Sequence, residues 1–490
     1  MINIPTDSIY NPQKWGLSVE ATKNLGIRLY AFWMRFHEYF MTKTRDTGEY
    51  AYHYLSGQLR METERNFTNI GHITGVNKQN MQHFMSNSPW EAQAVINQVQ
   101  TEVAATPELQ GGVLILDESA NEKSGNKSAG AGRQYNGRLG KVEMSQVGTF
   151  LSYAKGSYWT WVDGELFLPE HWFASEMADL RESLGIPPER TFETKIELGW
   201  KMIQRTDANG LPFNAICCDD FYGQSGKFRA QMRDDYIYMA DVPQDTLVYL
   251  EKPVIGIPSV QSGKPGRQSS TPKVISDDKP LKVCDVPRLK DTNWSRVRVR
   301  TTERGELNDE FAVRSIWTIY EGNPVREWLV IRQESENKRT YSLSNASLDT
   351  PLNDLAGLKC RRFFVERSIQ DAKSEAGWDE LQAQKYLAWV HHLSLTILSL
   401  WFVTQTKIDW AKQHPRDPAL LKLLDVDVLP ELSMANVREM LRAAMPLPSF
   451  SVEEANELVV KHLVNRTRSR KSRMKSNNRH SWEEGFSKVE

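Results

Sequence analysis

The feature that most constrains this 490-residue chain is an apolar run, Gly111 to Leu116, which ends abruptly in the carboxylate of Asp117. An apolar run this short, led by two glycines, is typical of a buried central strand. Asp117 is therefore expected at the carboxyl end of that strand, where an open sheet presents charged groups to a crevice. Such an aspartate can be catalytic, or it can merely open a turn.

A second short apolar run, Asn214 to Cys218, also ends in acid, at Asp219 and Asp220. After it, the spacing of apolar residues predicts a helix from Lys227 to Asp234 and a strand from Asp235 to Val242. Strands that alternate with helices indicate an α/β layer architecture. Two strands of that architecture would each deliver a carboxylate.

Between these two acids, residues 124–141 hold five glycines and four cationic residues. A glycine-rich basic loop suits close approach to a phosphate backbone. It matches neither a dinucleotide fingerprint nor a P-loop, because the third glycine and the closing Gly-Lys-Ser/Thr are missing. A flexible, solvated loop is the alternative. The candidate DNA contacts here are Arg133, Arg138 and Lys141.

From residue 246 to 349, short strand signals replace helical ones, and charged and apolar residues alternate along one predicted strand. Such a cationic face is usually only solvated, yet with tryptophans nearby it also fits backbone contact and base stacking. Trp294 is the preferred stacking residue because it precedes the arginines, although all three tryptophans can equally be core. The residues concerned are Arg296, Arg298, Arg300, Trp294, Trp317 and Trp328.

The segment from Leu355 to Val403 is strongly helical in pattern and contains Arg362, Glu366 and Lys373. Separations of four and seven residues are about one and two helical turns, so the three side chains share one broad face. An amphipathic surface helix with one ion pair would show the same spacing.

The two ends of the chain have their own patterns. Apolar residues three and four apart predict a helical, aromatic-rich module from Leu17 to about Val103. Lys461 to His480 holds eight Lys or Arg and no acid. A basic run of this kind is most often solvated, and it can equally follow phosphates.

Bulk composition restricts the function only weakly. Lys plus Arg number 61 against 62 for Asp plus Glu, so the formal net charge of −1 gives no global indication of a nucleic-acid partner. Four cysteines without paired metal spacing indicate reduced thiols. Without an export signal or a run of eighteen apolar residues, neither export nor membrane spanning is expected. We expect a soluble intracellular protein.

Four stretches together resemble the DDE transposases of bacterial insertion sequences, specifically the insertion sequence four superfamily and its seven-zero-one branch. The most specific is residues 362–379, where Arg362, Glu366 and Lys373 fit the family spacing of Arg, three residues, Glu, six residues, Lys. The family has Tyr three residues before this Arg, where Lys359 stands here. The other stretches are Leu-Asp-Glu-Ser at 116–119 with the basic loop downstream, Leu-Phe-Leu-Pro-Glu-His-Trp at 166–172 and Cys-Asp-Asp-Phe-Tyr-Gly at 218–223.

The resemblance implies an α/β fold with an RNase H-like core, a mixed sheet flanked by helices, interrupted by an all-β insertion. The expected regions are a helical DNA-binding or assembly region at 1–105, the first part of the core at 106–245 and the β-rich insertion subdomain at 246–349. The second part of the core, with the catalytic Glu helix, is expected at 350–410, and a helical region with a basic tail at 411–490.

The resemblance also implies Asp117, Asp219 and Glu366 as catalytic residues and ligands of two Mg²⁺ ions, with Mn²⁺ as a substitute. Three acids suit this role because two ions about 4 Å apart need anionic oxygen ligands. Arg362 and Lys373 would hold phosphates near the cut. The implied partner is double-stranded DNA, as terminal inverted repeats and target, bound by a homodimer in a bacterial cytoplasm, at the nucleoid. Cleavage is expected to pass through DNA hairpins.

Two other classes of protein share parts of this pattern. A DNA-binding protein derived from a transposase would keep the fold and lose an acid, whereas all three acids are present here. A metal-dependent nuclease or phosphatase would lack the strand-rich insertion. Strand transfer, as opposed to cleavage alone, distinguishes these classes.

Overall fold

The computed structural model describes residues 5, 7–137, 139–258, 272–302, 305–447 and isolated positions between 451 and 474. The chain forms two compact units, Met1–Met445 and Pro446–Glu490. In the second unit, the described positions from 452 to 474 are helical and exposed. Most of the basic run from Lys461 to His480 lies outside the described residues, as does Arg138. The rest of this description concerns the first unit.

Helices occupy the chain before the first strand, as the apolar spacing predicts. Their buried face is aromatic, with Phe32, Phe36, Phe40 and Tyr54 almost fully inaccessible. The α-helices are α1 (Val19–Lys23), α2 (Leu25–Met34), α3 (Gly48–Arg60), α4 (Phe67–Thr74), α5 (Lys78–Ser86) and α6 (Ala92–Ala105), with 3-10 helices at Pro12–Trp15, His37–Phe40 and Pro107–Leu109.

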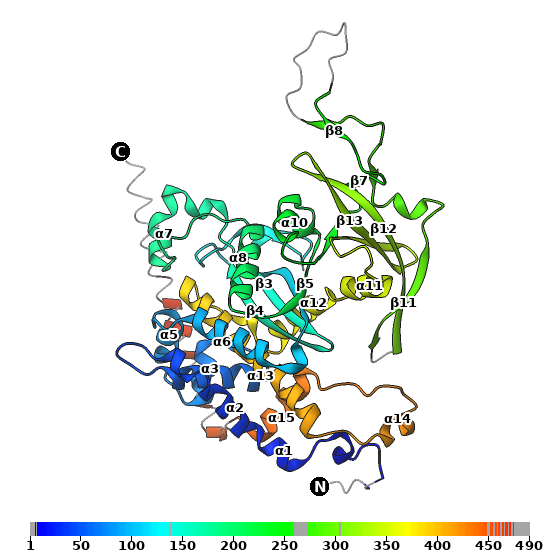
Figure 1. The fold of residues 1–490 in the computed structure, drawn as a ribbon. Coiled ribbons are helices and arrows are strands. Elements are labelled where there is room, and N and C mark those ends of the chain that lie inside the picture. Colours follow the sequence, from blue (N-terminus) through cyan, green and yellow to red (C-terminus); the bar gives the residue numbers. More distant parts are fainter. Residues whose placement is uncertain are drawn as a thin grey trace, which may run out of the picture. The chain divides into compact units, whose positions relative to one another are not determined.

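A ten-stranded mixed sheet forms the centre of the first unit, in the order β11-β12-β13-β14-β6-β5-β1-β3-β2, with β4 paired to β3 (Figure 1). Only the β1–β5 and β5–β6 pairs are parallel among its described strand pairs. The strands are β1 (Gly112–Glu122), β2 (Gly132–Asn136), β3 (Lys141–Lys155), β4 (Tyr158–Leu166), β5 (Phe213–Cys218), β6 (Tyr238–Val242), β11 (Trp294–Thr302), β12 (Gly305–Tyr320), β13 (Asn323–Ser335) and β14 (Lys338–Ser344).

The strands expected to form a separate β subdomain extend the central sheet instead. β14 pairs antiparallel with β6, with Tyr341 opposite Val242 and Ser344 opposite Met239. Hydrogen bonding therefore continues from the core strands into β11–β14, so an independent insertion subdomain is not confirmed. Two small sheets lie outside this one, made by β7 (Leu247–Val248) with β10 (Leu281–Lys282) and β8 (Ile255–Gly256) with β9 (Lys273–Val274).

Helices cover both faces of the central strands, and the alternation along β1 decides which residue meets which helix. Leu116 packs against Gly199 of α8 (Lys195–Ala208) on one face. Ile115 joins a core with Phe364 and Val365 of α12 on the other. Because successive side chains of a strand point to opposite faces, Asp117 lies on the α12 side. The helices here are α11 (Leu352–Cys360) and α12 (Phe363–Ser374), with α7 (Ala178–Ser183), α9 (Asp220–Gly223) and α10 (Gly226–Met232) between strands.

A long helix, α13 (Tyr386–Gln413), joins the helical region to the sheet by packing on α3, α5, α6 and β4. Among the described residues it alone is long and apolar enough to cross a membrane, and 89% of its apolar window is buried inside the protein, as in a core helix. His391 and His392 on it are buried and bonded to backbone carbonyls of Met85 and Trp378, which explains them structurally. Two helices follow, α14 (Ala419–Leu424) and α15 (Met434–Ala444).

Candidate active site

The parallel strands set a row of three aspartates across the sheet. Leu116 of β1 pairs with Cys218 of β5, which pairs with Ala240 of β6. The next residue on each strand is acidic, namely Asp117, Asp219 and Asp241. Neighbouring strands lie about 4.8 Å apart, so the three acids are neighbours at one level of the sheet.

Asp117 does not end its strand, contrary to the sequence-based expectation. β1 continues to Glu122 because β3 pairs with it along that whole length, with Asp117 opposite Phe150. What ends at Leu116 is the parallel pairing with β5. Beyond Leu116, β1 is therefore paired with β3 alone among the described strands, and Asp117 has no strand partner on the side where β5 ends.

Asp219 is held by the short helix that begins after it. Its carboxylate caps α9 by accepting a hydrogen bond from the backbone N–H of Tyr222 (3.3 Å). The turn then lies against β6 so closely that a Cβ on Gly223 would be 1.9 Å from the carbonyl oxygen of Asp241. The Asp-Asp-Phe-Tyr-Gly sequence thus needs glycine at its end because backbone approaches backbone there.

Arg362, just before α12, brings the helix and the strands together. Three nitrogens of its guanidinium each face a different carboxylate: Nε is 3.1 Å from Asp241, one terminal nitrogen is 3.7 Å from Asp117 and the other is 2.7 Å from Glu366. The predicted spacing of Arg362 and Glu366 on one helix face is confirmed by their ion pair. Glu366 is the most exposed of these acids, at 57% of its side chain, against 14% for Asp117.

Electrostatics distinguish the two neighbouring aspartates from ordinary surface acids. Burial, and then the negative charge of Asp219, raise the pKa of Asp117 above its usual value, while Arg362 opposes the shift. Burial likewise raises the pKa of Asp219. Burial alone would lower the pKa of Arg362, but the carboxylates of Asp241, Asp117 and Glu366 together raise it. Keeping both aspartates ionised is therefore costly, and Arg362 compensates for their burial only in part.

Asp241 was missed by the sequence analysis, which predicted its strand but did not single out this acid. It differs from the other two aspartates because it has a second cation: Nζ of the buried Lys359 lies 3.1 Å from it. Ser342, opposite Asp241 on β14, donates to the same carboxylate and accepts from Lys359 (2.5 Å). Lys359, which stands where the family has tyrosine, is buried and is thus paired with an anion of its own, the partly buried Asp241. The register of β5 and β6 was the signal that could have found Asp241.

The remaining acids near the motif have structural partners. Glu118 faces the opposite side of β1, where Nζ of Lys195 donates to it (2.6 Å). Glu375 forms an ion pair with the buried Arg438. Asp220 is exposed at the start of α9. Lys373, which is predicted to hold phosphate, donates to the backbone carbonyl of Ala120 on β1 (3.1 Å) in this DNA-free structure.

The other predicted DNA contacts lie on exposed strands. Arg133 on β2 and Lys141 at the start of β3 are exposed, and Lys141 pairs with Glu143 at 3.1 Å. On β11, Arg296 and Arg298 are exposed on either side of the buried Val297, as the alternation predicts. The side chain of Arg300 lies outside the described residues.

The three tryptophans considered for base stacking are partly packed in the protein. Trp294 lies against the core cluster of Val248 and Ile316, with the Arg339 guanidinium 5.4 Å from its ring centre. Trp328 packs against another cluster and donates to the carbonyl of Ser347 (3.0 Å), and Trp317 has Lys252 5.4 Å from its ring. This packing favours a structural role for each.

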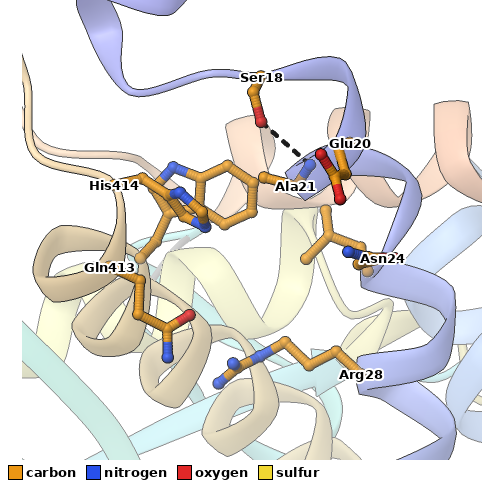
Figure 2. A pocket seen from close by; sticks show the side chains of 9 residues that line it. Ser18, Glu20, Ala21, Asn24, Arg28, Gln413 and His414 are labelled. Carbon is orange, nitrogen blue, oxygen red and sulfur yellow. Dashed lines mark hydrogen bonds between the residues drawn. The ribbon is translucent and has the colours of Figure 1, made fainter.

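A pocket of about 330 Å³ lies away from the acids, between the first two helices and the end of α13 (Figure 2). Glu20 is its one lining carboxylate, beside Arg28 and His414. Ser18 is occupied there in capping α1, since it accepts from the backbone N–H of Ala21 (3.1 Å). The pocket offers no group of acids for metal-dependent chemistry.

The oxygen atoms of the acid row decide whether it could hold a divalent metal ion. Asp117 and Asp219 are neighbouring hard oxygen donors whose pKa values are raised, chiefly by burial, and a divalent cation would favour their ionised forms. Over the described part of the chain, however, no group of three or more His, Cys, Asp or Glu is gathered to hold a metal ion. The two aspartates therefore fit, while Glu366 is held by Arg362 and would have to leave it to join them.

Comparison with known proteins shows the family to which the chain belongs. The sequence pattern of the family described as DDE superfamily endonuclease matches residues 35–306, more than half of the chain, and the chain belongs to this family. The matched range contains Asp117 and Asp219 and stops before Glu366.

One relative shows which kind of DDE protein the chain resembles. The chain is 26% identical over 332 residues, 65% of its length and 72% of the relative's, to the probable transposase for insertion sequence element IS701 from Microchaete diplosiphon. The resemblance to DDE transposases of the seven-zero-one branch is thereby confirmed.

Proposed function

We propose that this DDE endonuclease is a transposase that cuts the ends of an insertion sequence and joins them to target DNA, with Asp117, Asp219 and Glu366 as its catalytic acids. The observation that carries the proposal is the register of β1 and β5, which makes two partly buried carboxylates neighbours at one level of the sheet. Membership of the DDE family and the IS701 relative support the reaction class.

The proposed cofactor is a divalent ion, two Mg²⁺ in the family pattern with Mn²⁺ as a substitute. When bound, it would activate a water or hydroxyl nucleophile and stabilise charge on the scissile phosphate and the leaving 3′-oxygen. Asp117 and Asp219 would hold it with anionic oxygens, and Glu366 would complete the set after release from Arg362. The guanidinium of Arg362 would then be available to bind a phosphate oxygen.

Around this site we propose the family architecture: an RNase H-like core made of residues 106–245 and 350–410, with β11–β14 as the inserted strands. The proposed partners are terminal inverted repeats and target DNA, bound by a homodimer in the cytoplasm. Cleavage through hairpins belongs to this proposal. The exposed Arg133, Arg296 and Arg298 are suited to backbone contact.

The test is Mg²⁺-dependent nicking of a labelled duplex that carries the element's end, run beside a gel-shift measurement. Asp117→Asn, Asp219→Asn and Glu366→Gln each keep shape and remove one anionic ligand, so each should abolish nicking and leave binding nearly intact. Asp220→Asn is the matched control, because Asp220 is exposed next to Asp219. Substantial nicking by any of the three variants would show that the wrong acid was assigned.

Two other acids near the motif, Glu375 and Glu118, are less suitable as controls. Glu375→Gln would disturb the ion pair with the buried Arg438, and Glu118→Gln the pair with Lys195, so loss of activity there can reflect folding. Strand transfer to a target plasmid separates a transposase from a nuclease: nicking without joined products would favour the nuclease, and binding without nicking a DNA-binding derivative.

A further inference from the structure

Resting on the proposed catalytic role of Asp117 and Glu366, we infer that Asp241 is a positioning residue, which holds Arg362 so that its two outer nitrogens face those acids. Asp241 is third in the acid row, yet its surroundings differ from those of its two neighbours. It faces two cations, Lys359 at 3.1 Å and Arg362 at 3.1 Å.

The geometry of the guanidinium gives Asp241 this role. A planar guanidinium has its N–H groups fixed relative to one another, so binding at Nε determines where the two terminal nitrogens point. Asp241 binds at Nε, and the terminal nitrogens then lie 3.7 Å from Asp117 and 2.7 Å from Glu366. The Arg362 side chain is 28% exposed, so part of it reaches solvent while its Nε is held by Asp241.

Asp241 is itself fixed by groups that belong to neither catalytic acid. Ser342 on the next strand donates to its Oδ1, and Lys359, with only 5% exposure, bonds both of them. The same contacts argue against Asp241 as a metal ligand. Its two oxygens are already occupied, Oδ1 by Lys359 and Ser342 and Oδ2 by Arg362.

The experiment measures the nicking rate of a pre-bound enzyme–DNA complex, and separately the affinity for that DNA. Asp241→Asn should lower the rate roughly 10- to 100-fold, because small misplacements at a reacting centre cost about that much. Affinity should stay nearly unchanged, since many contacts over the DNA backbone supply it. The same loss should be absent when Arg362 is already Gln, because Asp241 acts through that residue.

A second variant separates positioning from stability. Asp241→Asn leaves the buried Lys359 without its anion, so the single variant can lose stability as well. Asp241→Asn combined with Lys359→Met removes both buried charges and should restore the melting temperature while the nicking rate stays low. Recovery of the rate together with the melting temperature would make the role structural and overturn the inference.

Two further outcomes would also overturn it. If the effects of Asp241→Asn and Arg362→Gln multiply, Asp241 does not act through Arg362. If Asp241→Asn abolishes nicking and also the Mg²⁺-induced rise in melting temperature, as Asp117→Asn should, Asp241 is a metal ligand. If Asp117→Asn and Asp219→Asn nicked DNA at the wild-type rate, the proposed function would be refuted. Failure of the inference about Asp241 can therefore be told apart from failure of the proposed function.

Discussion

Asp117 and Asp219 are neighbouring acids at a partly buried strand edge. Burial raises the pKa of both, and the charge of Asp219 adds to the shift of Asp117, so keeping both ionised costs free energy. Arg362 offsets part of this cost, but its Nε faces Asp241, and its closer terminal ion pair is with Glu366 rather than with Asp117. The metal-free protein is therefore expected to hold these residues under electrostatic strain, which a bound cation would relieve.

This strain predicts how stability depends on pH. A folded-state pKa raised above the usual 3.8 means that stability is gained as pH falls through the raised pKa, and lost as pH rises through it. Asp117→Asn mimics the protonated form, so without metal it should be more stable than wild type at pH 7 to 8, by roughly 1 to 3 kcal/mol. The difference should vanish as pH approaches 3.8.

The measurement is thermal unfolding of both proteins across this pH range, with and without Mg²⁺. Mg²⁺ should raise the melting temperature of wild type and have little effect on Asp117→Asn, because a ligand stabilises only a protein that binds it. Equal stability of the two metal-free proteins at pH 8 would contradict the electrostatic account. Asp220→Asn, at an exposed neighbour, should change neither quantity.

At this scale the sequence predicted a good part of the site. Each apolar run that ended in acid pointed to Asp117 and Asp219, and helical spacing placed Arg362 beside Glu366. Asp241 was not predicted because no apolar run ends at it, and only the strand register shows that it lies level with Asp117 and Asp219. The spacing pattern could not show that the Lys373 amine reaches the carbonyl of Ala120, and its contact with phosphate stays a prediction.

Helix α9 is packed so closely on β6 that it leaves no space for a larger side chain at Gly223. It is one helical turn, capped by Asp219 and placed directly against the backbone of β6 at Gly223. A methyl group there would have to displace either the turn or the strand, and both carry residues of the acid row. The close approach thus connects backbone packing to the position of two carboxylates.

Gly223→Ala should therefore destabilise the protein by about 2 to 4 kcal/mol, as overpacking against rigid backbone does. It should also lower nicking, because Asp219 and Asp241 shift with the displaced backbone. Thermal or denaturant unfolding measures the first effect and the nicking assay the second.

Gly357→Ala provides the matched control for this prediction. Gly357 lies in α11 with nothing within 4 Å of where its Cβ would be, so alanine should be neutral or stabilising by up to about 1 kcal/mol. If Gly223→Ala were as stable and active as Gly357→Ala, the close packing of α9 on β6 would not matter to the site.

Across the whole molecule, the helical region and the sheet share one core through α13. Tyr54 of α3 and Nδ1 of His392 on α13 are 2.8 Å apart, and Gln100 of α6 donates to the carbonyl of Val162 on β4 (2.8 Å). The predicted boundary near residue 105 thus crosses buried hydrogen bonds. The first 445 residues also form a single compact unit.

We therefore expect residues 1–445 to unfold in one cooperative transition. Tyr54→Phe, which removes one buried hydrogen bond, should lower stability by about 1 kcal/mol. The shift should be the same whether helix content by circular dichroism or tryptophan fluorescence is followed. Calorimetry that resolved two transitions, with only one moved by Tyr54→Phe, would show that the helical region is an independent domain.

Element types were predictable from the sequence at this scale, because periods of two and of three to four residues appear along it. How the strands join was not. The change in texture near residue 246 suggested a new subdomain, yet β14 returns to pair with β6, a contact between residues about a hundred positions apart that no local pattern records.

The alternation along β1 also bears on how such a gene can change over time. Insertion or loss of one codon between Gly112 and Leu116 would turn Asp117 toward α8 and Glu118 toward Arg362, whereas a change of two codons would restore the original facing. Only insertions or deletions of an even number of codons in this short stretch would therefore keep Asp117 on its present face of the sheet. Loss of one codon here would put Glu118 in the place of Asp117, an acid longer by a methylene at the level of Asp219, whereas insertion of one codon would leave Glu118 facing Arg362 two residues further along the strand.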